Sequence, residues 1–420
     1  TKAKELFTPI DPQNVTIYAC GPTVYDDPHV GNARSLVVFD LLFRVLRKIY
    51  GDNNVTYVRN ITDVDDKIID IAKEKKLSIE NITKEVTKQF HLACKNLNCL
   101  IPTVEPKATS HIEEMIKMTE SLIKKGYAYI NEGHVFFAVS SFKNYGKLSN
   151  KNLEELKAGS RVEVSKLKNN PLDFVLWKPS EDKDPGWDSP WSRGRPGWHL
   201  ECSVMSEKYL GKKFDIHGGG LDLVFPHHEN EIAQSCSNNS SDKMANYWVH
   251  NGFLTMEKEK MSKSLGNVVS ISSAVKEHNG QVVRLALLSS HYKQPLDWNK
   301  SILSQCKSTL NKWYNLYSEK FNISENLECF DYLLDDLNTP NYIKSLHELY
   351  NEAINGNNKK RDTFNAACRL IGLFNVNKIE WEKSKKGSIK IPEKLIQSKI
   401  NERLLAREKG DFKLADKIRD

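Results

Sequence analysis

The sequence has no run of hydrophobic residues that could cross a membrane: no window approaches the ~18 consecutive apolar residues that a transmembrane helix requires. Its first residues, TKAKELFTPI, do not have the pattern of a secretory signal peptide. Internal repeats are also absent. A hydrophobic content of 39% and a charged content of 27% exclude disorder and fibrous structure for most of the chain. We therefore expect a soluble, cytoplasmic protein, and its 420 residues predict two to four domains.

Eight cysteines are present, but no two of them form a CxxC pair. Their spacing does not indicate a disulfide framework, which favours a reducing compartment. We expect Cys94, Cys99 and Cys236 to be buried or incidental thiols. Any cysteine with a chemical role must be identified from its neighbours.

The charge is only mildly unbalanced, with 61 Lys and Arg against 54 Asp and Glu and a net charge of +7. This excess permits a polyanionic partner without requiring one. It is concentrated near the end of the chain, where residues 381–420 contain 12 Lys and Arg against 7 Asp and Glu. Taken alone, that segment is typical of a solvated helical surface.

The N-terminal part alternates between β-rich runs and helical patterns. Residues 15–20 predict a strand that ends at Gly21-Pro22, residues 33–50 have helical spacing, and residues 54–61 predict a second strand. This alternation predicts a parallel α/β sheet whose first loop faces the strand ends, where such folds bind ligands.

Later segments predict two further regions. Short strands within residues 127–177, separated by charged and Trp-rich loops, are typical of an insertion into the α/β domain, and a sheet strand returns at residues 213–217. Beyond Asn299 the strand patterns stop, and we expect three or four amphipathic helices.

Two motifs are suited to binding phosphate. The segment PHVGN (28–32) lies at a predicted strand–loop–helix junction, where backbone N–H groups attract anions, Gly31 allows close approach and His29 can donate a hydrogen bond. The segment KMSKSLGN (260–267) combines two lysines, two hydroxyls and a glycine in a basic loop that could clamp a polyphosphate. A structural turn and an exposed basic loop are the alternative interpretations.

A third group of residues has the composition of a metal site. Cys20 ends the first predicted strand, Cys202 lies in WHLEC, and PHHENE (226–231) opens a predicted helix. His227 and Glu231 are four residues apart and share a helical face, but His228 and Glu231 are also neighbours, so spacing does not choose between the two histidines. Two thiolates, one imidazole and one carboxylate would suit zinc, whereas separate core cysteines are the alternative.

Read together, these segments resemble class I aminoacyl-tRNA synthetases, and most closely the cysteinyl-tRNA synthetase family. The resemblance is carried by long blocks in the family's order, from Tyr18 to about Asn338, and by INERLLAREKGDFKLADKIRD near the end. The blocks are CGPTVYDDPHVGNAR, ITDVDDK, GWHLECSVMS, FDIHGGGLDLVFPHHENEIAQS and KMSKSLGN. The family usually continues for several tens of residues past KIRD, so we expect the C-terminal part of the anticodon-reading region to be missing from this chain.

The resemblance implies a role for each matching residue. The implied catalytic residues are His29, Asn32, Lys260 and Lys263, and the implied ATP-binding residues are Gly31, Asp222, Lys263 and Ser264. The amino-acid pocket would contain Trp198 and His217, and the zinc ligands would be Cys20, Cys202, His227 and Glu231, which selects His227 over His228. Asn32 replaces the second histidine of the family's first motif; it can still donate a hydrogen bond, so we expect activity to survive.

The family's architecture implies a Rossmann-like parallel-sheet catalytic domain with a connective insertion, followed by an all-α helical bundle. We expect the following division: 1–100, first half of the catalytic domain; 101–195, insertion; 196–255, second half; 256–305, stem-contact region with the KMSKS motif; 306–420, tRNA-binding helical bundle.

The implied reaction has two stages: ATP activates L-cysteine to cysteinyl-adenylate with release of pyrophosphate, and cysteine is then transferred to the 3′ end of tRNA(Cys). One Zn²⁺ per chain would select the substrate, because zinc favours sulfur and lowers the pKa of a thiol, whereas an apolar pocket rejects an added hydroxyl by only ~10²-fold. We also expect Mg²⁺ with the ATP, a monomeric protein and no membrane partner.

Other functions share some of these features. A ligase that transfers activated cysteine to the amine of a small thiol precursor would have the same sheet, zinc ligands and KMSKS motif, but the basic helices favour tRNA. A zinc-sensing or RNA-binding relative of a synthetase should have lost His29, Lys263 or a zinc ligand, and all are present. A nucleotidylyltransferase would lack the four-ligand set.

Overall fold

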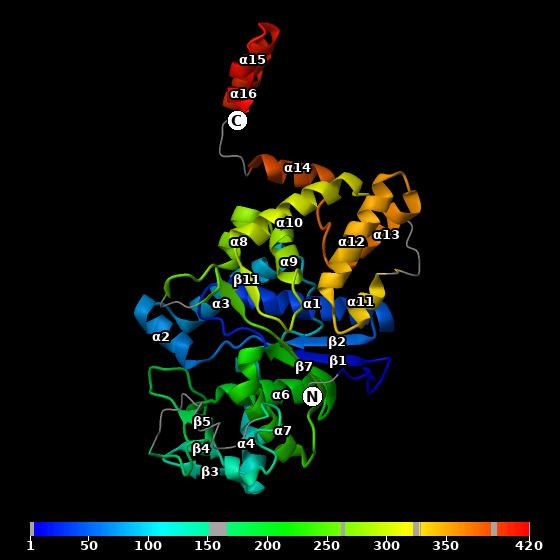
Figure 1. Cartoon of the computed structure of the whole chain (residues 1–420). Coiled ribbons are helices and arrows are strands. Elements are labelled where there is room, and N and C mark those ends of the chain that lie inside the picture. The colour runs from blue at the N-terminus through cyan, green and yellow to red at the C-terminus, as the bar shows by residue number, and fades with distance from the viewer. Residues whose placement is uncertain are drawn as a thin grey trace.

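The computed structural model describes residues 4–150, 166–261, 265–321, 327, 329–387 and 393–419. Its centre is a sheet of four parallel strands in the order β2-β1-β7-β8 (Figure 1). The strands are β1 Val15–Ala19, β2 Val55–Arg59, β7 Phe214–Gly220 and β8 Ala245–Asn251. The predicted parallel sheet is therefore confirmed.

Both faces of this sheet are covered, because neighbouring residues of β1 belong to two separate hydrophobic clusters. Ile17 packs in the cluster that includes α1, Val30–Tyr50, and Tyr18 packs in the cluster that includes α6, Trp198–Leu210. Alternate side chains of a strand point to opposite faces, and a parallel sheet covered on both faces has continuously apolar strands. All five residues of β1 are buried.

An insertion with short strands interrupts the α/β domain, as the sequence predicts, and these strands form an antiparallel sheet. Its strand order is β3-β4-β5-β6, with β3 Ala128–Asn131, β4 His134–Phe137, β5 Phe174–Pro179 and β6 Gly194–Pro196. Before it come α2 Asp66–Lys75, α3 Ile79–Asn96 and α4 Ile112–Lys124. After it, α6 returns the chain to the parallel sheet, which continues through β7, α7 Glu229–Asn239 and β8.

A small three-stranded sheet follows, in the order β10-β9-β11. Its strands are β9 Leu254–Met256, β10 Glu259–Lys260 and β11 Leu296–Trp298, and α8 Ile271–His278 and α9 Gly280–Leu288 lie between β10 and β11 in the chain. The segment before α8 runs beside the start of α1: the Val30 N–H donates to the Val269 carbonyl at 2.9 Å, and the Ile271 N–H to the Pro28 carbonyl at 2.8 Å.

The described residues after Asn299 contain α-helices and no strand, as expected, but they form seven helices rather than three or four. The expectation was too low because several of these helices are short. They are α10 Lys300–Trp313, α11 Phe330–Leu334, α12 Thr339–Ile354, α13 Asn358–Leu370, α14 Lys378–Gly387, α15 Glu393–Glu408 and α16 Phe412–Arg419. Figure 1 shows α15 and α16 at the opposite end of the molecule from the antiparallel sheet. Within the described ranges, no helix combines the length and the apolar character needed to span a bilayer.

Candidate active site

Two of the site residues come from adjacent parallel strands. Cys20 directly follows β1, and its N–H donates to the Gly218 carbonyl of β7 at 3.1 Å. His217 lies in β7, opposite Tyr18 in the register of the two strands. Their side chains therefore meet near the carboxyl ends of the strands, where parallel α/β sheets bind ligands.

Two helices complete the cluster. Cys202 lies in α6, and the segment Val224–His228, which is kinked at the extended residue Phe225, leads into α7 with Glu231. One ligand atom from each of Cys20, Cys202, His227 and Glu231 lies within 4.8 Å of all the others. The His227 Nε2 is 3.1 Å from Glu231 Oε1, as expected for residues four apart on a helix. The structure thus brings together all four residues expected to bind zinc.

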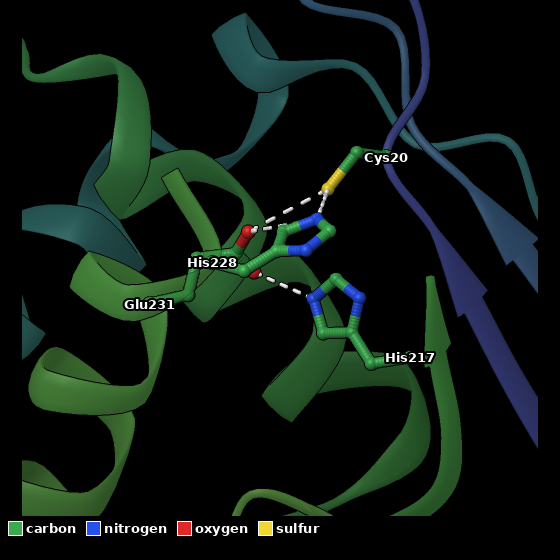
Figure 2. A group of neighbouring side chains, drawn as sticks. All are labelled: Cys20, His217, His228 and Glu231. Atoms are coloured by element: carbon green, nitrogen blue, oxygen red, sulfur yellow. Dashed lines mark hydrogen bonds and ion pairs between the residues drawn. The ribbon is translucent and has the colours of Figure 1, made fainter. Parts of the chain in front are cut away.

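A second set of residues satisfies the same distance condition: Cys20, His217, His228 and Glu231 (Figure 2). Cys20 Sγ lies 3.4 Å from His228 Nε2 and 3.5 Å from Glu231 Oε1, and His217 Nε2 lies 2.7 Å from Glu231 Oε2. Both sets use Cys20 and Glu231, so they describe two overlapping positions for an ion. Only the first set contains Cys202 and His227, and only the second contains His217 and His228.

Four histidines in and beside the cluster are held neutral. Burial lowers the pKa of His227 to about 3, with Glu231 opposing the shift, and burial likewise lowers the pKa of His199 to about 3. Burial, with the neighbouring imidazoles, lowers the pKa of His228 well below its usual value and that of His250 to about 4. A neutral imidazole is the form that binds metals.

The thiols are held protonated. Burial raises the pKa of Cys20 well above its usual value, and the neighbouring Cys202 and Glu231 raise it further. A hydrogen bond with Cys20 lowers the pKa of Cys202, but burial and the charge of Glu231 outweigh it, so that the pKa of Cys202 is also raised. A bound cation would reverse this preference, since metals bind cysteine as the thiolate. Sulfur, nitrogen and oxygen donors in one buried cluster fit a zinc ion.

Trp198 and His217 both contact this cluster. The Trp198 ring stacks on the His227 ring with 4.2 Å between centroids, and 38% of the tryptophan remains exposed. His217 is fully buried and stacks on Trp248 at 4.6 Å. Trp198 therefore covers the cluster on its solvent side, and His217 lies on its buried side.

The first phosphate-type motif caps α1. His29 is the N-cap residue: its Nδ1 accepts from the Asn32 N–H at 3.3 Å, and the Asn32 Oδ1 accepts from the His29 N–H at 3.0 Å. This reciprocal pair is a capping box, in which His29 takes the position usually occupied by Ser or Thr. With Nδ1 accepting, a neutral His29 ring carries its proton on Nε2 and can donate from there.

The second motif begins beside the first. A Cβ at Gly31 would lie 2.8 Å from Met261 Cε and 2.9 Å from His29 Nδ1, so the absence of a side chain lets the two motifs approach. Lys260 ends β10, but its side chain and all of Lys263 and Ser264 lie outside the described residues. Asp222 is exposed in a short turn, Leu221–Leu223, directly after β7.

Three histidines of this region were not predicted as site residues. His199 Nδ1 lies 2.9 Å from His227 Nδ1, and His228 Nδ1 lies 2.8 Å from His250 Nε2. A signal for two of them was present, because His199 lies next to Trp198 and His228 next to His227. His250 comes from β8, and only the strand order brings it here.

Comparisons with known proteins identify the family of this chain. Residues 6–308 match the family model of the class I tRNA synthetase (C) catalytic domain. The chain is 56% identical to the cysteine–tRNA ligase of Pelagibacter ubique over 420 residues, covering 99% of this chain and 92% of the relative. It is 50% identical to the cysteine–tRNA ligase of Beijerinckia indica over 426 residues, covering 100% and 93%.

Solved structures of lower sequence identity share the fold. Methionyl-tRNA synthetase of Mycobacterium tuberculosis with methionyl-adenylate has a TM-score of 0.59 at 15% identity, over 86% of this chain and 89% of that one. LeuRS of Agrobacterium radiobacter, in a ternary complex with tRNA, has a TM-score of 0.62 at 12% identity, over 87% and 83%. The predicted α/β fold with an insertion and a helical region is confirmed, and the chain belongs to the cysteinyl-tRNA synthetase family of class I aminoacyl-tRNA synthetases.

Proposed function

We propose that this chain activates L-cysteine with ATP and transfers the cysteinyl group to tRNA(Cys), and that the buried cluster behind Trp198 selects the amino acid. The observation that carries the proposal is that two thiols, an imidazole and a carboxylate converge within 4.8 Å of one another at the strand ends. His29 lies at the end of the loop that follows the same strand as Cys20.

In this proposal Cys20, Cys202, His227 and Glu231 hold one zinc ion. When bound, zinc would favour the cysteine side chain as a thiolate and so discriminate against serine, whose hydroxyl is a harder donor with a much higher pKa. His217 orients the Glu231 carboxylate through its 2.7 Å hydrogen bond. Trp198 restricts access on the exposed side and, with His217, forms the wall of the amino-acid pocket.

Activation requires no general base, because the carboxylate of cysteine is already ionised. One carboxylate oxygen bonds to the α-phosphorus of ATP, the bond to the bridging oxygen breaks, and pyrophosphate leaves. Phosphate charge is neutralised by His29 from its Nε2, by the N–H groups at the start of α1, by Lys260 and Lys263, and by Mg²⁺ with the ATP. Gly31, Asp222 and Ser264 would contact the nucleotide, and Asn32 would hold His29 in its cap.

In the second stage a hydroxyl oxygen of the terminal adenosine of tRNA bonds to the cysteinyl carbonyl carbon, the bond from that carbon to the phosphate oxygen breaks, and AMP leaves with the hydroxyl proton passing to its phosphate. The basic helices would contact the phosphate backbone of the tRNA. In the proposed division of the chain, residues 1–100 and 196–255 form the two halves of the catalytic domain and residues 101–195 form the insertion. Residues 256–305 form the stem-contact region, and residues 306–420 form the helical bundle. We propose a monomer, since one chain supplies every residue of the proposed site.

Aminoacylation of a tRNA(Cys) transcript with labelled cysteine tests the function directly. Attachment of cysteine, with serine rejected, is the expected result. Cysteine-dependent ATP–pyrophosphate exchange without any transfer to tRNA would instead favour the ligase that acylates a small amine. Exchange that does not depend on cysteine would contradict the proposal.

A further inference from the structure

Arg34 is a buried arginine of α1, five residues beyond the N-cap His29, and is 1% exposed. Its guanidinium is surrounded by oxygen atoms of two other segments. Nη1 donates to the Phe253 carbonyl at 2.9 Å, and the two N–H groups of Nη2 share four acceptors, which are the carbonyls of His291 at 3.2 Å, Tyr292 at 3.4 Å and Gln294 and the Ser290 hydroxyl at 3.3 Å.

The charge of Arg34 is balanced by these oxygens alone. In the described part of the chain no carboxylate lies within ion-pair distance of it. Burial lowers the pKa of Arg34 to about 10, which still leaves it charged near neutral pH. A buried charge is costly unless it is well hydrogen-bonded, so this arginine specifies the positions of the carbonyls around it.

Those carbonyls belong to Phe253 and to the loop of residues 290–294, the two segments that position the β9–β10 hairpin. Phe253 directly precedes β9, and its carbonyl also accepts the Leu296 N–H at 3.1 Å, where β11 begins. Strand β9 pairs with β10, which ends at Lys260, the first residue of the second motif. One guanidinium thus joins the helix that begins with the first motif to the sheet that leads into the second.

The loop of residues 290–294 is also held by contacts with the helical region. Asp336, in the turn before α12, accepts from the Tyr292 hydroxyl at 2.7 Å and from Lys293 Nζ at 2.5 Å. The Thr339 hydroxyl donates to the Ser290 carbonyl at 3.4 Å. The carbonyls around Arg34 are therefore held in place by the helical region as well.

We propose that Arg34 is a positioning residue for amino-acid activation, which fixes the β9–β10 hairpin, and so the second motif, relative to His29. The inference rests on the proposed function, in which both motifs bind the phosphates of one ATP. A lysine cannot replace it, because a single ammonium does not reach the Phe253 carbonyl and the 291–294 carbonyls with the geometry of a planar fork.

The test compares Arg34→Lys with Arg284→Lys in cysteine-dependent ATP–pyrophosphate exchange. Arg284 is the matched control: it is also fully buried in the structure and donates to the carbonyls of Leu97 at 2.9 Å and Ile371 at 2.7 Å, neither of which belongs to β9 or to the 290–294 loop. In R34K, kcat should fall about 10²-fold, as for a ~1 Å misplacement of reacting groups. Its KM for cysteine and its zinc content should stay at wild-type values.

R284K should instead lower the melting temperature while kcat of the folded protein is retained. The proposal is overturned if R34K keeps the wild-type kcat, or if it loses zinc and cysteine affinity together with kcat. An unfolded R34K does not leave the question open, because Gly252→Ala disturbs the same loop without changing Arg34: its Cβ would lie 2.8 Å from the carbonyl oxygen of Gln294, which accepts from Arg34, and 2.8 Å from that of the neighbouring Lys293.

G252A should therefore show the same selective loss of kcat, and an unchanged kcat in that variant also overturns the proposal. Failure of the proposed function is a separate outcome, since it would show as wild-type protein without cysteine-dependent exchange.

Discussion

Replacing Cys202 by alanine separates the two overlapping ligand sets of the buried cluster. Only the set of Cys20, Cys202, His227 and Glu231 contains this sulfur, whereas Cys20, His217, His228 and Glu231 do not need it. If the first set holds the ion, Cys202→Ala weakens zinc binding and His228→Ala does not. The second set predicts the reverse.

The size of the effect follows from the number of ligands. A structural zinc site with four protein ligands contributes roughly 10–16 kcal/mol, which is about 3 kcal/mol for each ligand. Because 1.4 kcal/mol is about tenfold in affinity, losing one sulfur weakens binding by about 10²-fold or more.

The assay is zinc content per chain after dialysis, followed by competition with a chromogenic chelator to obtain Kd. Cys236→Ala is the matched control, because Cys236 is a buried thiol of α7, 2% exposed, that belongs to neither ligand set. Its zinc affinity should equal that of the wild type. Wild-type affinity in C202A, together with loss of zinc in H228A, would refute the assignment of ligands.

Three further substitutions test other parts of the account. Lys263→Ala should slow adenylate formation by about 10²-fold while zinc stays bound, and an unchanged single-turnover rate would remove the lysine from the mechanism. Gly31→Ala should also slow exchange without loss of zinc, because its Cβ would lie 2.9 Å from Nδ1 of the His29 ring; full activity would show that this ring can shift without cost. Asp40 of α1 is buried and forms ion pairs with Arg284 and, at 2.8 Å, with Arg44; Asp40→Asn breaks them and should cost about 3–5 kcal/mol in the free energy of unfolding near neutral pH, measured by urea denaturation.

The contribution of Asp40 to the free energy of unfolding should depend on pH. Burial raises the pKa of Asp40, but the charges of Arg284 and Arg44 outweigh burial and hold it below the usual value of 3.8. A carboxyl whose folded pKa is lowered stabilises the fold above its unfolded pKa and loses that contribution as pH falls through the folded value. The difference between wild type and D40N should therefore shrink below about pH 3.8, and a difference that grows in acid would contradict this.

Much of the site could be predicted because its residues lie in continuous blocks. Cys20 follows an apolar strand, and His227 and Glu231 share a helical face, so local patterns make these residues candidates, and the family resemblance then selects the ligand set. Periodicity did not choose between His227 and His228, since both reach Glu231 from one turn of the chain.

The remaining features depend on tertiary contacts that no local pattern records. His250 joins the cluster only because β8 lies beside β7, and Arg34 finds its carbonyls more than two hundred residues later in the chain. Likewise, the number of C-terminal helices was underestimated because short helices such as α11, Phe330–Leu334, give too few turns for a clear amphipathic pattern.

The most direct test of the central claim is the ratio of cysteine-dependent to serine-dependent ATP–pyrophosphate exchange, measured before and after zinc is stripped with a chelator. If the cluster around Cys20 and Glu231 selects the amino acid through a metal, the stripped protein loses its preference for cysteine, and added zinc restores it. A protein shown by metal analysis to be free of zinc that still prefers cysteine over serine to the original extent would contradict the account.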